Sequence, residues 1–235
     1  MVNEDKVIEN YKNAMSRLET ALEESGRNVQ DVLVIGASKT MPLERILFVR
    51  DNTDVKIFGE NRVQELLSKY KLLKPVHSHF IGHLQTNKVK DIIDKVEMIE
   101  SVHSLKLANE ISKQALAAKV QMDVLLEINI GNEETKSGFA PNAAENAVRE
   151  IAKLPNIHIK GLMCIPPAAD VPEDARKYFR NMYKLFLDIR GKNIDNSSMS
   201  FLSMGMSHDF DIAVSEGATL VRVGTSLFGK RNYNI

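Results

Sequence analysis

Short apolar runs alternate with longer amphipathic segments along most of the chain. Runs of about four to eight apolar residues are typical of buried strands, and apolar positions three and four apart are typical of helices. The expected strands cover about residues 31–38, 56–59, 76–81, 97–102, 123–130, 157–164, 200–203 and 219–223. The expected helices cover 42–50, 62–70, 87–93, 104–118, 141–153, 175–190 and 208–216, with room for one more turn in 228–235.

One additional helix is expected before this alternation begins. Residues 3–25 place six apolar side chains three or four positions apart, with charged residues between them: Val7, Ile8, Tyr11, Met15, Leu18 and Leu22. This spacing predicts an amphipathic helix, and Gly26 marks its end.

Eight strands that alternate with helices indicate an α/β protein with parallel strands joined by right-handed crossovers. Eight such units in 235 residues fit a closed (β/α)8 barrel, which typically needs ~250 residues. A doubly wound open sheet is the alternative, because the number of strands does not prove closure. The sequence has no linker or break in composition, so we expect residues 1–235 to form a single domain.

Composition limits the classes of binding partner and the cellular compartment that we expect. The 31 basic and 31 acidic side chains cancel, so no long-range attraction to nucleic acid or to an anionic membrane is expected. The single cysteine, Cys164, has apolar neighbours and is interpreted as a small buried side chain in a reducing compartment. The charged N-terminal segment is unlike a secretion signal, and no apolar run reaches membrane-spanning length. We therefore expect a cytoplasmic protein.

Lys39 is the first candidate for chemistry. It follows the apolar run Leu33–Ile35 in LVIGASKTM (33–41), where the first expected strand ends. Burial disfavours the charged form of a lysine, and a neutral amine attacks aldehydes and ketones. The alternative is a lysine that extends from the strand end into solvent.

Two loops near the end of the chain have the composition of a phosphate site. The segment 203–207, SMGMS, leads from the seventh expected strand into a helix, and Gly224-Thr225 follows the eighth. Small residues expose backbone N–H groups, a helix N-terminus favours anions, and barrels often hold phosphate with these two loops. The alternative is a helix capped by Ser207 and an ordinary tight turn.

Three further positions have open interpretations. Arg222 alternates with apolar neighbours and needs a buried partner, either a carboxylate or the ring nitrogen or anion of a ligand. His77 and His79 share a strand face, but no close carboxylate is expected to complete a metal site with His83, so no metal is predicted. Lys136 lies in a glycine-bearing loop, either solvated or meeting an incoming anion.

A reactive lysine together with a phosphate site defines a ligand with an aldehyde at one end and a phosphate at the other. Pyridoxal 5′-phosphate (PLP) fits this description, and so does a phosphorylated sugar in a Schiff-base aldolase. Seven segments of the sequence resemble the pyridoxal phosphate homeostasis proteins: VIGASKT (34–40), FGENRVQE (58–65), HFIGHLQTNK (79–88), KSGF (136–139), GLMCI (161–165), LSMGMSHDFDIA (202–213) and VRVGTSLFG (221–229).

The resemblance implies the barrel fold of the alanine racemase N-terminal domain with covalently bound PLP. It implies that Lys39 forms the Schiff base and that Arg222 faces the pyridine nitrogen. The phosphate would be held by three residues: Ser207, Gly224 and Thr225. Two further residues would lie beside the ring: Asn61 and His83.

The resemblance also implies a function in vitamin B6 homeostasis, by buffering or transferring PLP, without catalysis. Racemases use a second base from an added C-terminal domain, and the sequence after the eighth strand leaves no room for one. A racemase-like enzyme of low activity with Lys39 as its base is the alternative; the motifs argue against the aldolase. We expect a monomer whose partners are PLP and, transiently, apo-enzymes that need it.

Overall fold

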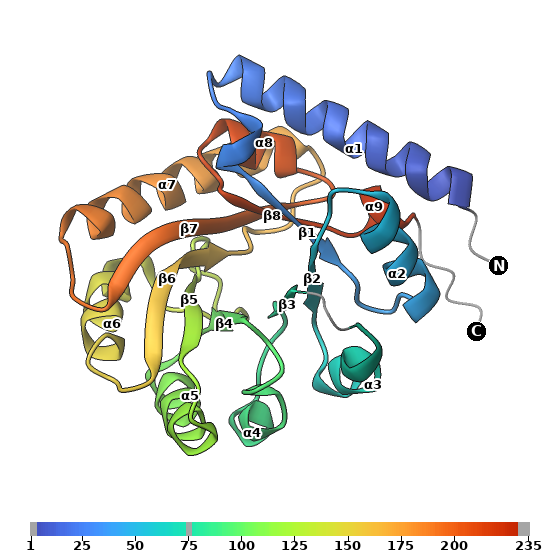
Figure 1. Cartoon of the computed structure of the whole chain (residues 1–235). Coiled ribbons are helices and arrows are strands. Elements are labelled where there is room, and N and C mark those ends of the chain that lie inside the picture. The colour runs from blue at the N-terminus through green and yellow to red at the C-terminus, as the bar shows by residue number, and fades with distance from the viewer. Residues whose placement is uncertain (1–3, 74–76, 230–235) are drawn as a thin grey trace.

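The computed structural model describes residues 4–73 and 77–229 and forms a closed barrel of parallel strands (Figure 1). The strands follow one another around the barrel in chain order: β1 (Leu33–Ala37), β2 (Ile57–Glu60), β3 (His77–Phe80), β4 (Met98–Val102), β5 (Met122–Ile128), β6 (Ile157–Cys164), β7 (Ser197–Met206) and β8 (Leu220–Val223). Strand β8 pairs with β1, with Arg222 opposite Ile35. This closure confirms the predicted (β/α)8 barrel and excludes the open sheet.

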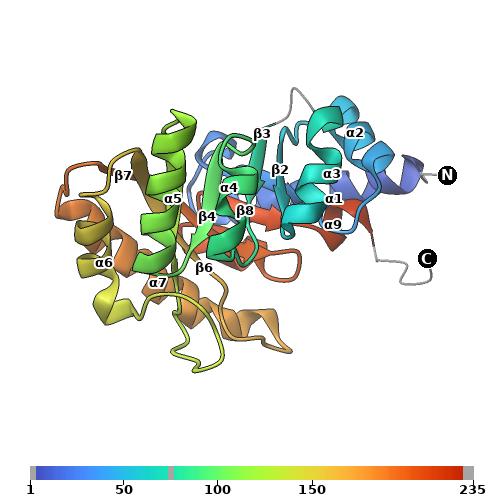
Figure 2. The same cartoon turned by 90° about the horizontal axis from the view of Figure 1, so that it is seen from below.

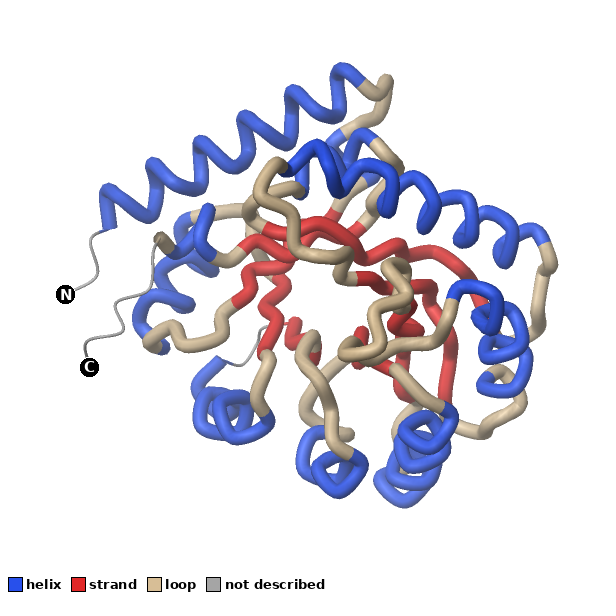
Figure 3. The backbone as a smooth tube through the Cα atoms, turned by 180° about the vertical axis from the view of Figure 1, so that it is seen from behind, coloured by secondary structure: helices blue, strands red, loops and turns tan. Residues whose placement is uncertain are grey.

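Helices surround the ring of strands on its outer side (Figure 3). Those that connect the strands are α2 (Leu43–Asn52), α3 (Val63–Leu73), α4 (Val89–Ile92), α5 (Leu105–Ala118), α6 (Ala144–Ile151), α7 (Arg176–Gly191) and α8 (Phe210–Ser215). A short helix, α9 (Thr225–Phe228), follows β8 directly. Within the described residues, no helix is both long enough and apolar enough to cross a membrane.

The predicted additional helix is present as α1 (Glu4–Glu24). Its buried side chains include Val7, Leu18 and Leu22, as the spacing predicted. Figure 1 shows α1 lying along the outside of the barrel beside α8 and α9. The helix therefore covers the part of the wall that includes the last strand.

The predicted end of the seventh strand is wrong. Strand β7 runs through Met206 instead of ending at Ser203, so most of the segment expected to be a loop is strand. Gly205 has a φ of +89°, and a Cβ on it would lie 2.5 Å from the Cβ of Ala213 in α8. A glycine here lets the strand continue past α8 at close range. The short helix α9 (Thr225–Phe228) follows β8, and the further turn expected in 228–235 extends outside the described residues, as does the expected strand start at Val76.

Side chains inside the barrel change character from one layer to the next. An apolar cluster fills the lower interior: Ile35, Met98, Leu125, Met163 and Leu220. Two residues further along three of these strands, on the same face, the side chains are charged: Glu100, Glu127 and Arg222. The apolar layer therefore closes one end of the barrel, and polar groups occupy the interior toward the carboxyl ends of the strands.

Candidate functional site

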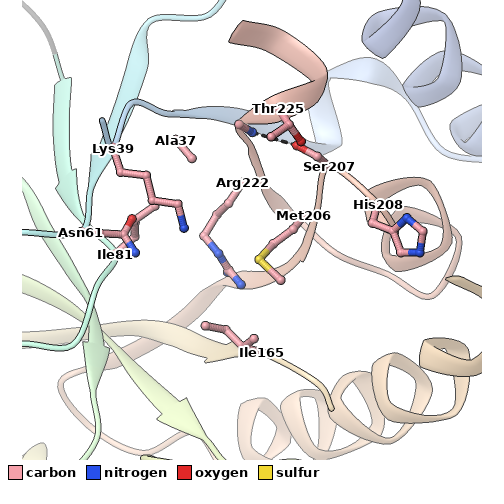
Figure 4. A pocket seen from close by; sticks show the side chains of 11 residues that line it. Ala37, Lys39, Asn61, Ile81, Ile165, Met206, Ser207, His208, Arg222 and Thr225 are labelled. Atoms are coloured by element: carbon pink, nitrogen blue, oxygen red, sulfur yellow. Dashed lines mark hydrogen bonds between the residues drawn. The ribbon is translucent and has the colours of Figure 1, made fainter. Parts of the chain in front are cut away.

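A cavity of about 350 Å³ opens at the carboxyl ends of the strands (Figure 4). Its lining comes from six strands or the turns that follow them: Ala37, Lys39, Asn61, Ile81, Ile165, Met206, Ser207, His208, Arg222, Gly224 and Thr225. The structure thus brings together six of the seven residues that the sequence assigns to cofactor binding. The seventh, His83, lines a neighbouring cavity.

Lys39 stands in the turn immediately after β1. Ala37 and Lys39 both line the cavity, whereas Ser38 between them is fully buried outside it. The alternation of the strand therefore continues into the turn and directs Lys39 inward. Figure 4 shows its amine extending toward Asn61 and Arg222 rather than away from the cavity.

The turns after β7 and β8 are joined by the Ser207 side chain. Its Oγ accepts hydrogen bonds from the backbone nitrogens of Gly224 at 3.0 Å and Ser226 at 3.2 Å. The Ser226 hydroxyl donates to the Ser207 carbonyl oxygen at 3.0 Å. These contacts form one compact turn pair with exposed Thr225 at its edge. Ser226 was missed in the sequence, although it directly follows the Gly-Thr pair.

The expected role of the segment 203–207 needs correction. Because Ser203 through Met206 belong to β7, only Ser207 of this segment stands in the turn that follows the strand. Ser207 does not cap α8 either, since Asp209 occupies that position and its Oδ1 accepts from the Met206 nitrogen at 2.7 Å. Ser207 instead serves as the link between the two turns.

Arg17 of α1 supports this turn pair from outside. Its Nη1 donates to the Ser207 carbonyl oxygen at 3.1 Å, and its Nη2 lies 2.9 Å from Asp211 Oδ2. The guanidinium also lies over the Phe210 ring, 4.3 Å from its centroid. The additional helix therefore holds the Ser207 turn in place, a role that its amphipathic pattern did not reveal.

Arg222 projects from β8 into the polar layer and is 4% exposed. Its Nη1 donates to Ser203 Oγ at 2.5 Å, and its Nη2 donates to the Cys164 carbonyl oxygen at 2.9 Å. The sequence left a carboxylate or a ligand open as its partner. In the structure, its hydrogen-bond partners are a hydroxyl and a carbonyl oxygen. A carboxylate in turn accepts from that hydroxyl.

That carboxylate belongs to Glu100, which is fully buried. Ser203 donates to one of its oxygens at 2.6 Å, and the other oxygen lies 2.7 Å from His79 Nδ1. Burial acts to raise the pKa of Glu100, but the hydrogen bond and charge of His79, with the charge of Arg222, hold it below its usual value. Arg222, Ser203, Glu100 and His79 therefore form a continuous buried chain beneath the cavity.

A second cavity of about 350 Å³ adjoins the first and shares Asn61, Ile81 and Ile165 with it. Its remaining lining is mostly polar: Gly82, His83, Ser101, Glu127, Ile128, Asn129, Thr135, Lys136 and Ser137. Between the two, Asn61 has a buried Oδ1 with no hydrogen-bond partner among the described residues. A buried amide oxygen of this kind is a site where a polar ligand group can donate.

Two stacked histidines, a glutamate and a lysine determine the charge distribution in and beside the second cavity. The rings of His83 and His103 stack with centroids 4.4 Å apart, and burial together with the charge of His83 lowers the pKa of His103. Burial raises the pKa of Glu127 to about 7, although the charge of Arg222 opposes the shift. Lys136 donates to the Pro166 carbonyl oxygen at 3.0 Å and pairs with Glu133 at 2.5 Å. Figure 2 shows the loops that carry these two contacts, after β5 and β6, projecting from the same end of the barrel.

The histidines on β3 have carboxylate partners that the sequence did not predict. His77 Nδ1 lies 2.7 Å from Glu97, and His79 pairs with Glu100. These pairs form because β4 lies beside β3 in the barrel. No group of three His, Cys, Asp or Glu residues within 4–73 and 77–229 has a metal-binding arrangement. Cys164 is buried as expected, and burial raises the pKa of its thiol to about 12.

Comparison with known proteins identifies the class of barrel. The family model of the alanine racemase N-terminal domain matches residues 3–232. A pyridoxal phosphate homeostasis protein from Aquifex aeolicus is 44% identical over 96% of this chain and 98% of its own length. The chain therefore belongs to the alanine racemase N-terminal domain family and, within it, to the pyridoxal phosphate homeostasis proteins.

Solved structures agree with this assignment. An unknown protein from Bifidobacterium adolescentis superposes with a TM-score of 0.91 at 32% identity, covering 96% of this chain and 95% of its own. PipY of Synechococcus elongatus PCC7942, in a structure with PLP bound, gives a TM-score of 0.76 at 28% identity, covering 91% of this chain and 100% of its own.

Proposed function

We propose that this protein binds PLP as a Schiff base on Lys39 and acts in intracellular vitamin B6 homeostasis, by buffering or transferring the cofactor without substrate turnover. The observation that carries the proposal is one cavity that combines the Lys39 amine, the Arg222 guanidinium and the turn at Ser207 and Gly224. The names of the similar proteins and the PLP-bound PipY structure support the same ligand.

The donor set fits both ends of PLP. Lys39 would hold the aldehyde end of PLP through its amine, which could form a C=N bond there with loss of the carbonyl oxygen as water. At the other end, the Ser207 hydroxyl accepts from the Gly224 and Ser226 nitrogens and keeps its own proton to donate to a phosphate, and Gly224 and Thr225 line the cavity beside it. When bound, PLP supplies an electrophilic carbon and a ring that can accept electrons.

Arg222 favours storage of the cofactor over turnover. A guanidinium stays protonated, so it can only donate a hydrogen bond to the pyridine nitrogen and keeps that nitrogen unprotonated. An unprotonated ring withdraws electrons less strongly, which weakens carbanion chemistry. The cavity lining offers an imidazole at His208, and Figure 4 shows that ring turned away from Lys39 and Arg222.

A racemase-like activity of low rate is the second candidate. It is favoured by Glu127 in the adjoining cavity, whose pKa of about 7 suits a proton carrier near neutral pH. Steady exchange of amino-acid enantiomers by the purified protein, abolished by Lys39→Ala, would select this candidate over a carrier.

The visible absorption spectrum tests the main proposal. The wild-type protein should show a yellow Schiff-base band that borohydride removes, and Lys39→Ala should lack the band. Lys153→Ala, which alters an exposed lysine beside α6, is the control and should keep it. A wild-type protein that stays colourless after PLP is added would overturn the proposal.

The proposed function includes a cellular compartment, an oligomeric state and partners. We infer a single cytoplasmic domain of residues 1–235 that acts as a monomer and delivers PLP to apo-enzymes. Sedimentation of the protein with and without PLP tests whether it is a monomer. A second experiment compares transfer of PLP to an apo-enzyme across a dialysis membrane with transfer in mixed solution, and it tests whether the two proteins must be in contact.

A further inference from the structure

A second lysine lies behind the turn that carries Lys39. Lys69 on α3 is 8% exposed and is absent from the lining of either cavity near Lys39. Its Nζ donates to the Ser38 carbonyl oxygen at 3.1 Å and to the carboxylates of Glu60 at 2.9 Å and Glu65 at 2.8 Å. An ammonium group has three protons, so these contacts satisfy all of them.

Both glutamates also bond the residues on either side of Lys39. Glu60 Oε1 accepts from the Ser38 hydroxyl at 2.7 Å. Glu65 Oε1 accepts from the backbone nitrogen of Thr40. The residues before and after Lys39 are thus bonded to one buried cluster, which we call the Lys69 clamp: Lys69, Glu60 and Glu65.

Thr40 shows that the clamped turn is strained. Its φ is +63°, in the left-handed region that β-branched residues avoid. Its hydroxyl donates to the Lys39 carbonyl oxygen at 2.6 Å, a contact local to the same turn. A residue stays in such a conformation where its surroundings hold it there, and strain of this kind is concentrated at functional sites.

The clamp acts from the side opposite the cavity. Ser38 presents its hydroxyl to Glu60, while Lys39, the next residue, lines the cavity. Glu60 is 2% exposed, and its Oε2 has no hydrogen-bond partner among the described residues. A buried ionic cluster with an unsatisfied oxygen stabilises a fold less well than apolar packing of the same volume. Stability alone therefore does not explain this cluster.

We propose that Lys69, with Glu60 and Glu65, positions the Lys39 amine for attack on the aldehyde of PLP. The inference rests on the proposed function and extends it: the clamp holds the strained turn so that Lys39 enters the cavity before PLP arrives. Lys69 is a positioning residue, because its contacts are with the turn and not with the ligand.

The rate at which the Schiff-base band appears after mixing the cofactor-free protein with PLP tests this role. Lys69→Met removes the ammonium and keeps the length of the side chain, and the rate should fall about tenfold to a hundredfold, as expected for a displaced reacting group. Arg176→Met is the control, because it breaks a contact of 3.0 Å with Glu216 remote from the cavity. It should lower the melting temperature and leave the rate unchanged.

A rescue separates positioning from folding. Glycine adopts a φ near +63° without support, so adding Thr40→Gly to Lys69→Met should restore part of the lost rate. If Lys69→Met does not fold, Glu65→Gln replaces it, since the amide keeps the shape and weakens the bonds to Lys69 and Thr40. A wild-type rate in Lys69→Met or, where that variant does not fold, in Glu65→Gln would overturn the inference, and so would a slow Lys69→Met that Thr40→Gly does not improve.

The same experiment distinguishes this inference from the proposed function. A wild-type protein that forms no band contradicts the function itself. A wild-type protein that forms the band at the same rate as the Lys69 variant contradicts only the clamp.

Discussion

The hydroxyl of Ser207 lies 3.0 Å from the backbone nitrogen of Gly224, so the turns after β7 and β8 form one unit. Arg17 and Ser226 both bond the carbonyl oxygen of Ser207 and fix the unit from either side. An anion that accepts a hydrogen bond from the Ser207 hydroxyl therefore meets a group already in position, which reduces the entropy lost on binding.

Ser207→Ala is expected to weaken PLP binding about tenfold, which corresponds to about 1.4 kcal/mol. The alanine leaves the amides of Gly224 and Ser226 without their acceptor and lets the two turns move apart. A fluorescence titration gives the dissociation constant. Ser198→Ala, at an exposed position early in β7, is the control; equal affinities in the two variants would contradict the prediction.

Arg222→Gln is expected to lower the free energy of unfolding by about 1–3 kcal/mol, because the buried Ser203 hydroxyl and Cys164 carbonyl oxygen lose the guanidinium that donates to them. Urea denaturation of the cofactor-free protein measures the change. Arg149→Gln, which breaks an exposed pair with Glu145 on α6, should change the same quantity by less than about 1 kcal/mol. A comparable loss of unfolding free energy in both variants would show that the buried hydrogen-bonded chain contributes no more to stability than a surface ion pair.

Glu127 predicts a specific pH dependence of stability in the cofactor-free protein. Its folded pKa, about 7, lies above the unfolded value of 4.5, so the folded state holds a proton that the unfolded state has released. This contribution is complete below pH 4.5 and is lost as the pH rises through 7. Relative to wild type, Glu127→Gln should gain about 1–2 kcal/mol between pH 5 and pH 8, after allowance for solvent in the cavity. Parallel curves for the two proteins would contradict the assigned pKa.

Lys136→Ala tests whether the loop after β5 controls passage of the cofactor. Lys136 lines the second cavity and bridges to Pro166 in the loop after β6. Without this bridge, both loading and release of PLP should change severalfold while the affinity changes less. Stopped-flow absorbance gives both rates, and Lys153→Ala is the control. Unchanged loading and release would show that Lys136 does not affect passage of the cofactor.

The barrel could be predicted from the sequence because each strand is a short apolar run and each crossover is a recognisable helix. The residues at the strand ends then follow from the fold, which is why Lys39, Arg222 and Gly224 could be placed at one mouth. The contacts between them could not be predicted. Ser203 meets Glu100 across the barrel interior, and the register between β7 and β8 shifts between Ser203 and Met206.

Lys69 was missed for a different reason. It lies on α3, where a lysine in an amphipathic pattern is ordinarily solvated. Only the approach of Glu60 from β2 and of Ser38 from the turn after β1 makes it a buried group. Ionic contacts between different helices and strands produce no periodic pattern in the sequence. They become visible only when the three-dimensional arrangement of those elements is known.

The pairing of β8 with β1 is the seam at which the barrel closes. Lys39 follows one side of that seam, and the amides of the turn after Val223 follow the other. A ligand bonded to both Lys39 and this turn would connect the two sides of the seam. Opening of the seam would then break one of the two contacts. By mass action, binding of such a ligand opposes opening of the seam. The free energy of unfolding of such a protein should therefore rise with the concentration of its ligand.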